Sequence, residues 1–238
     1  MAELSRAAAD EAVLLADAGF DALLIENMHD VPYLNGAVGP EIVAAMTAIG
    51  AAVRSAVGGP LGVQVLAGAN RAALAVAHAI GAQFVRVENY VFSHVADEGL
   101  MPRAAAGPLL RYRRRIGASE IRILADVKKK HAAHALTADL SIAQVAAAAE
   151  FAGADGVIVT GGATGLPADV EELRTVRAAV RVPVLVGSGL TASTLAAYWP
   201  HADAFVVGSA LKVAGVWSNP LEPARLREFV AAARELRG

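Results

Sequence analysis

The chain has 238 residues, 55% of them hydrophobic, and it contains no cysteine. This length and composition suffice for one buried core, so we expect a single domain over residues 1–238. The lack of cysteine excludes disulfides, thiolate metal ligands and cysteine nucleophiles. The 21 lysines and arginines nearly balance the 23 aspartates and glutamates, so no overall positive charge would recruit nucleic acid. We interpret the arginine-rich stretch 111–115 as a solvated helix face.

The start of the chain does not resemble a secretory signal. Residues 1–19 mix acidic with apolar residues and lack a basic start and a continuous apolar core. The longest stretch without Asp, Glu, Lys or Arg, 182–202, is interrupted by Gly, Pro and His. We therefore predict no membrane span and a cytoplasmic location.

Short apolar runs rich in β-branched residues alternate with longer alanine-rich segments of helical period. This alternation predicts repeated βα units and a parallel sheet. The segments 40–57, 69–81 and 140–153 are expected to be helices, and residues 1–19 begin the chain with another. The expected strands are 20–27, 61–66, 83–89, 121–127, 155–161, 183–189 and 204–209.

Such units can form a closed (β/α) barrel or a doubly wound sheet. The barrel is favoured because polar residues recur at the carboxyl end of nearly every strand, as one shared mouth would require. The fold class is therefore α/β, a TIM-type (β/α) barrel. Only seven strands are recognisable, because the chain begins with a helix where the first strand is expected.

Three carboxylates directly follow apolar strands: Glu26, Glu88 and Asp126. At a shared mouth, desolvation and mutual repulsion would separate their pKa values, which suits acid/base catalysis. The alternative for each is a structural ion pair, with Arg86 or a lysine as partner. This alternative weighs most for Glu88.

Glu26 and Glu88 are each followed by an asparagine, Asn27 and Asn89. An amide beside a carboxylate can donate to and accept from vicinal hydroxyl groups, so these pairs suit a sugar. Asp30 begins a long loop, punctuated by Pro and Gly, that is either a lid over the mouth or an ordinary surface loop.

Glycine-rich turns follow the last two predicted strands. The backbone amides of such turns can cradle a phosphate group, although glycines also make ordinary tight βα turns. A third turn, Thr160 to Gly162 with Thr164 and Gly165, would extend this cup. The residues predicted to bind phosphate are Gly187, Ser188, Gly189, Gly208, Ser209, Thr160 and Gly161.

The stretch DVKKKHAAHALT, 126–137, places lysines and histidines above a strand-end carboxylate. We interpret Lys128 and Lys129 as solvated, whereas Lys130 and His131 can stabilise an anion and transfer a proton. A divalent metal ion is an alternative, held by His131, His134 and Asp126, but the sequence requires no cofactor. A second polar loop contributes secondary candidates, His94, Asp97 and Glu98.

Seven motifs occur in order along nearly the whole chain: ENMHDVPY, VGPE, GVQVLAGAN, FSHVADEGL, ADVKKKHAAHALT, VTGGATG and VGSGLT. Together they resemble the BtpA/SgcQ family. The resemblance implies a TIM-barrel-like fold of the ribulose-phosphate-binding type. It links the chain to a family whose naming member is associated with photosystem I biogenesis and whose other members are grouped with sugar-metabolism genes. The matching motif positions are Glu26, Asn27, Asp30, Asp126, Lys130, His131, Thr160, Gly161, Gly187, Ser188, Gly189 and Gly208.

One departure from the family pattern stands out. Relatives begin with a strand and a Pro-rich loop, for which this sequence has no counterpart. Either the start is truncated, or the barrel is gapped and closed by a helix or a partner chain. A gap would leave unpaired strand edges, so we expect a homo-oligomer.

The leading hypothesis is an enzyme that acts on a sugar or nucleoside, in phosphorylated form, and hydrolyses a glycosidic or N-glycosidic bond. Asp126 or Glu88 would be the base, Glu26 would help stabilise the cationic centre, and Lys130 or His131 would serve the leaving group. One alternative is sugar-phosphate isomerisation or epimerisation. Another is a non-catalytic assembly factor.

Overall fold

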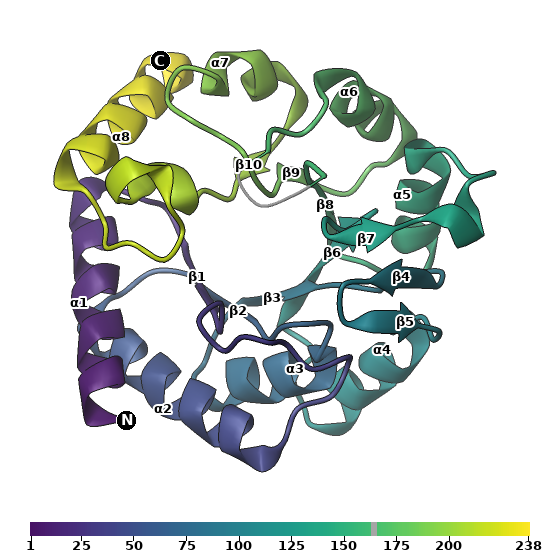
Figure 1. Ribbon diagram of the computed structural model, residues 1–238, viewed down its shortest axis with the longest axis horizontal. Helices are drawn as coiled ribbons and strands as arrows, with labels where there is room; N and C mark the ends of the chain where they lie inside the picture. Colours follow the sequence, from purple (N-terminus) through teal and green to yellow (C-terminus); the bar gives the residue numbers. More distant parts are fainter. Residues whose placement is uncertain (163–165) are drawn as a thin grey trace. The chain divides into compact units, whose positions relative to one another are not determined.

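The computed structural model describes residues 1–162 and 166–238 (Figure 1). The chain divides into two compact units. Unit 1 comprises Met1–Glu88 and Gly107–Ile123, and unit 2 comprises Asn89–Ala106 and Leu124–Gly238. The prediction of a single domain over 1–238 stays a prediction.

Unit 1 is built from alternating helices and parallel strands, as the periodicity predicts. The strands β1, β2 and β3 pair in this order, with Ile25 opposite Val63 and Val63 opposite Val85. α1 packs against α2, and α3 packs against β2 and β3. Its elements are α1 (Ala2–Ala18), β1 (Leu23–Glu26), α2 (Pro40–Ala56), β2 (Leu61–Gln64), α3 (Asn70–Ala79), β3 (Phe84–Val87) and nearly all of α4 (Ala106–Arg115).

Unit 2 continues the same alternation. The strands β6, β8, β9 and β10 pair in parallel in this order, with Asp126 opposite Ile158 and Ile158 opposite Leu185. α5 packs against α6 and β8, and α6 also packs against β9. The elements are most of β6 (Arg122–Val127), which enters this unit at Leu124, and α5 (Ile142–Phe151), β8 (Gly156–Val159), α6 (Val170–Ala179), β9 (Val184–Val186), α7 (Leu195–Tyr198), β10 (Ala204–Phe205) and α8 (Pro223–Arg237).

A small antiparallel sheet in unit 2 is absent from the sequence-based prediction. The hairpin of β4 (His94–Ala96) and β5 (Gly99–Met101) follows β3, and β7 (Ala132–Ala133) pairs with the other edge of β4. The loop predicted to carry Asp97 and Glu98 is therefore the turn of this hairpin. Because β7 lies in the loop after β6, this sheet fixes the stretch 128–137 against the hairpin.

A side-chain cap determines where the helix after this loop begins. A single turn of 3-10 helix, Ala135–Thr137, precedes α5. Ser141 then caps α5 reciprocally, because its hydroxyl accepts from the Gln144 amide at 3.2 Å while its own amide donates to the Gln144 side chain at 2.9 Å. This cap confirms the predicted helix 140–153 and fixes where the loop above Asp126 ends.

The described residues contain seven parallel strands, and α1 precedes the first of them, as predicted. Two of these strands are buried along their whole length, since all four residues of β2 and of β8 are buried. Burial on both faces is the reason that these strands appear in the sequence as continuous apolar runs.

Candidate functional site

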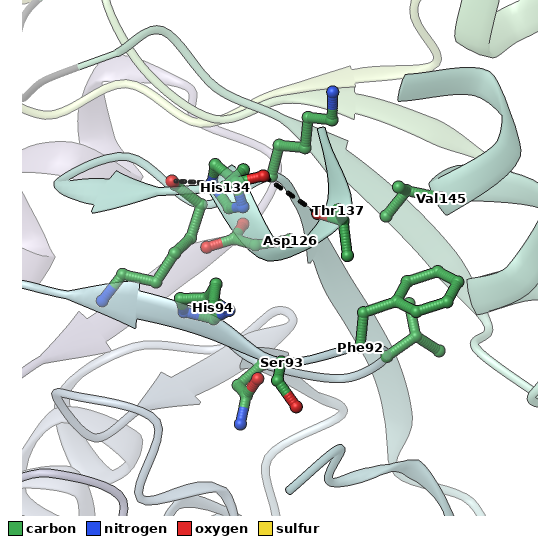
Figure 2. Close-up of a pocket in the computed structure, with 11 residues that line it drawn as sticks. Phe92, Ser93, His94, Asp126, His134, Thr137 and Val145 are labelled. Atoms are coloured by element: carbon green, nitrogen blue, oxygen red, sulfur yellow. Dashed lines mark hydrogen bonds between the residues drawn. The ribbon is translucent and has the colours of Figure 1, made fainter. Parts of the chain in front are cut away.

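A pocket in unit 2 lies between the β4 segment and the loop that follows β6 (Figure 2). Its lining comes from the segment that begins at Asn89, two residues after β3, from β4, from the end of β6 and the loop after it, and from α5. The lining residues are Asn89, Val91, Phe92, Ser93, His94, Asp126, Lys128, Lys129, His134, Thr137 and Val145.

Asp126 supplies the carboxylate of this pocket. It is the second-to-last residue of β6, next to Val127, and is 7% exposed. Figure 2 shows its side chain between the imidazoles of His94 and His134. The sequence placed a carboxylate at this strand end, and the structure surrounds it with groups that can exchange protons.

His94 is a buried, neutral imidazole. It belongs to β4, is 5% exposed, and its Nε2 has no hydrogen-bond partner among the described residues. Burial, the neighbouring His134 and the Lys129 ammonium lower the pKa of His94 from 6.5 to about 4. The ring is therefore uncharged at neutral pH and can exchange a proton or polarise a substrate oxygen.

His134 faces His94 from the opposite wall, with the ring centroids 5.4 Å apart and the planes tilted by 44°. Its Nε2 lies 3.0 Å from the Lys129 carbonyl oxygen. A carbonyl oxygen only accepts hydrogen bonds, so Nε2 carries a hydrogen and Nδ1 is an acceptor in the neutral ring. The backbone of the loop thus sets the tautomer of His134.

The expectation that Lys129 is solvated is wrong. Its side chain is 4% exposed, and its Nζ lies 3.4 Å from Oε2 of Glu98, which is itself only 9% exposed. Antiparallel pairing of β7 with β4 brings the two segments together, and a buried ammonium requires such a partner. This ion pair joins the loop after β6 to the hairpin that carries His94.

Lys130 and His131, the two residues singled out in this loop, are outside the pocket lining. His131 is exposed, adopts a positive φ of 54°, and directs Nδ1 to Oδ2 of Asp97 at 3.5 Å. Its amide donates to the Gly162 carbonyl at 3.1 Å. The imidazoles beside Asp126 are those of His94 and His134, and the catalytic roles of Lys130 and His131 stay predictions.

Glu26 and Glu88 belong to unit 1, whereas Asp126 belongs to unit 2. Arg86 is the ion-pair partner of Glu26 at 3.4 Å, so the structural alternative weighed most heavily for Glu88 applies to Glu26. Glu88 is buried, and its carbonyl accepts from the Asn70 side chain at 2.7 Å. Catalytic roles for these two carboxylates stay predictions.

The two Glu-Asn pairs differ in structure. Asn27 accepts from the Leu66 amide at 2.7 Å and donates to Asp30 at 3.2 Å, so its side chain holds the start of the predicted lid loop. Asn89 donates to the Arg103 carbonyl at 2.8 Å, while its Oδ1 has no partner among the described residues. Of these two asparagines, Asn89 lines the pocket.

The glycine-rich turns of the predicted phosphate cup already make hydrogen bonds within the protein. The Gly187 amide donates to the Val159 carbonyl oxygen at 2.8 Å, and the Gly161 amide donates to the Ser188 hydroxyl at 3.1 Å. Thr160 is buried, and its hydroxyl has no hydrogen-bond partner among the described residues. The phosphate cup stays a prediction, and Thr164 and Gly165 lie outside the described residues.

The described parts of the chain contain no group of three His, Asp or Glu side chains arranged to hold a metal ion. His131 is directed to Asp97, away from the set proposed with His134 and Asp126. The divalent metal ion remains an untested alternative.

Comparison with known proteins identifies the family. The model of the BtpA family matches residues 1–235. The chain belongs to the BtpA family. It is 45% identical to an uncharacterized mitochondrial protein of Caenorhabditis elegans over 92% of this chain and 80% of that one. It is 37% identical to the photosystem I biogenesis protein BtpA of Synechocystis, over 96% of this chain and 79% of that one.

Solved structures similar to this BtpA family member give its fold class. Thiamine phosphate pyrophosphorylase from Pyrococcus furiosus has a TM-score of 0.64 at 16% identity, covering 97% of this chain and 91% of that one. Phosphoribosyl anthranilate isomerase from Thermus thermophilus has a TM-score of 0.63 at 14% identity, covering 96% and 95%. These similarities confirm the TIM-type α/β fold class. No helix within 1–162 or 166–238 has the length and hydropathy needed to cross a bilayer.

Proposed function

We propose that this protein is an enzyme that acts on a sugar or nucleoside and hydrolyses its glycosidic or N-glycosidic bond. One observation carries the proposal: a buried carboxylate, Asp126, shares a pocket with a neutral imidazole, His94. A buried carboxyl group beside a neutral imidazole can take up and release protons, which acid/base catalysis requires. Phosphorylation of the substrate is supported by the names of the similar enzymes, which include a thiamine phosphate and a phosphoribosyl enzyme.

In the proposed reaction, water adds across the bond between the anomeric carbon and the leaving group. Asp126 takes a proton from the water as its oxygen bonds to the anomeric carbon, and the bond to the leaving group breaks. The leaving group takes up one proton, so the reaction consumes one water and needs no other reactant. We assign to this step the proton that Asp126 takes from the water, because the N–H of neutral His134 is held by the Lys129 carbonyl and Lys130 and His131 lie outside the pocket lining.

Isomerisation or epimerisation of a sugar phosphate is the second candidate, and the neutral state of His94 favours it. Asp126 would remove a proton next to a carbonyl group, and neutral His94 would donate a hydrogen bond to the carbonyl oxygen. A His94 pKa of about 4 suits this role, since a charged imidazolium would not persist at neutral pH. This reaction conserves mass, which separates it from hydrolysis.

Turnover by mass spectrometry tests both candidates. The full chain is incubated with nucleosides, nucleotides and pentose phosphates, with and without a divalent metal ion. Release of a free base supports hydrolysis, and a mass-neutral conversion resolved by chromatography supports isomerisation. Asp126→Asn should abolish turnover while ligand binding persists, and His78→Gln on the exposed face of α3 should behave as wild type.

Full activity of Asp126→Asn would remove this residue from the mechanism. Ligand binding without conversion, unchanged in Asp126→Asn, would support a non-catalytic assembly factor instead, in line with the name of the Synechocystis relative. A homo-oligomer and a cytoplasmic location are part of the proposal. Sedimentation and cell fractionation test them, and the mitochondrial relative makes the second test informative.

A further inference from the structure

Two polar atoms in the lining of the pocket are buried without a hydrogen-bond partner among the described residues: Nε2 of His94 and Oδ1 of Asn89. Buried polar groups in native proteins are nearly always paired, because desolvation without a partner is costly. His94 as a whole is 5% exposed, so bulk water does not supply the partner. A bound water or a ligand group can satisfy such atoms, and their chemistry shows which hydrogen bonds a ligand must make when it displaces the water.

The orientation of Asn89 shows what its free atom requires. Its Nδ2 donates to the Arg103 carbonyl at 2.8 Å, and a carbonyl cannot accept from the amide oxygen. Oδ1 is therefore the free atom, and it only accepts hydrogen bonds. A ligand that satisfies it must present an O–H or N–H group.

The charges around the pocket are balanced. Lys129 is paired with Glu98 at 3.4 Å, and the Lys128 ammonium donates to the Leu140 carbonyl at 3.2 Å. The two ammonium groups are matched by two carboxylates, those of Glu98 and Asp126. His94 adds no charge at neutral pH, because its pKa is about 4. The pocket therefore has no excess positive charge to hold a phosphate dianion.

We propose that this pocket binds the uncharged, hydroxyl-bearing part of the substrate, a vicinal diol such as that of a pentose ring, and excludes a phosphate group. A hydroxyl group donates to Asn89 Oδ1, and it can donate to or accept from His94 Nε2 in either neutral tautomer. A phosphate dianion only accepts, so it would leave Asn89 unsatisfied and would approach the Asp126 carboxylate. The inference rests on the proposed sugar or nucleoside substrate, and it places any phosphate of that substrate outside this pocket.

The test uses three small probes on the full chain at pH 7, followed by the NMR signals of the histidine rings. The first probe, 1,4-anhydroribitol, has the pentose ring and the diol but no leaving group. Tetrahydrofurfuryl alcohol has the same ring without the diol, and inorganic phosphate carries only the anion. His94→Gln assigns the His94 signal, and His78→Gln serves as the control on an exposed surface.

We expect anhydroribitol to shift the His94 signal in a saturable manner, and neither of the other probes to do so. Asn89→Gly should weaken anhydroribitol binding about three- to tenfold, the range for one neutral hydrogen bond. Glycine is the suitable replacement because residue 89 has a positive φ of 53°. His78→Gln should leave the affinity unchanged.

A His94 shift caused by phosphate, equal binding of the ring without the diol, or no response to any probe would overturn the inference. Turnover is not part of this measurement. If anhydroribitol binds as expected but no nucleoside or sugar phosphate is converted, the proposed function fails and the pocket assignment stands. If substrates are converted but anhydroribitol does not shift the His94 signal, the assignment of this pocket to the diol fails and the proposed function stands.

Discussion

The rings of His94 and His134 lie 5.4 Å apart at an angle of 44°, one on β4 and the other in the loop after β7. The two histidines are 40 residues apart in sequence and meet because β4 pairs with β7. Their proximity, with Lys129 nearby and burial of the ring, keeps His94 neutral. This relationship places two imidazoles beside the strand-end carboxylate of Asp126 (Figure 2).

The pH dependence of stability should report His94. Its folded-state pKa, about 4, lies below the ordinary value of 6.5, so the unfolded chain binds the proton more tightly between these values. Above about pH 6.5 His94 leaves the free energy of unfolding unchanged with pH. As the pH falls from 6.5 towards 4, protonation of the unfolded chain lowers this free energy by about 3 kcal/mol. Urea unfolding at pH 7, 5.5 and 4 measures it.

The groups that face His94 are His134, Lys129 and Asp126, which also titrate or carry charge. Comparison with His94→Gln isolates the contribution of His94 from theirs. The variant should lose less stability than wild type over the same pH interval. Identical slopes for the two proteins would show that His94 is not held neutral by the fold.

Breaking the Lys129–Glu98 pair should destabilise the protein strongly. Lys129→Met leaves the buried Glu98 carboxylate without its ammonium partner, and we expect the free energy of unfolding to fall by about 3 kcal/mol. The double variant Lys129→Met with Glu98→Gln should recover much of this loss, because no charge is then left unpaired. Additive losses in this double-mutant cycle would contradict the pairing.

Thr160→Val should raise stability. The Thr160 hydroxyl is buried without a partner among the described residues, so its removal should increase the free energy of unfolding by about 1 kcal/mol. Thr137→Val is the matched control, because the Thr137 hydroxyl donates to the His134 carbonyl at 3.3 Å and its loss should destabilise. If Thr160 contacts substrate as predicted, the same variant should bind ligand more weakly. Destabilisation by Thr160→Val would indicate a partner for this hydroxyl.

Gly189→Ala should destabilise the turn after β9 by at least about 2 kcal/mol. Gly189 has a positive φ of 71°, and an added Cβ would collide with the backbone of Leu166 and Pro167. Gly58→Ala is the control, since the space around Gly58 is open and its φ is not positive. Its effect should stay within about 0.5 kcal/mol. Thermal unfolding of the two variants measures the difference, and equal melting temperatures would contradict the close packing of Gly189 against Leu166 and Pro167.

The parallel strands could be predicted because burial on both faces makes each of them a continuous apolar run. The predicted strand 121–127 is observed as Arg122–Val127, and 155–161 as Gly156–Val159. The strand ends were predicted less accurately, since the predicted strand 204–209 is observed only as Ala204–Phe205. Polar residues after a strand do not reveal where its ladder of hydrogen bonds stops.

The sequence by itself determined the α/β class, the seven parallel strands and the strand-end position of Asp126, because these depend on local periodicity. The hairpin of β4 and β5 was missed, since strands of three residues are too short to show a period. Only tertiary structure decided that Lys129, rather than Lys130, is buried, and that His94 and His134 flank Asp126 (Figure 2). Neighbouring loop residues point in different directions, and pairing between distant segments selects which of them face the pocket.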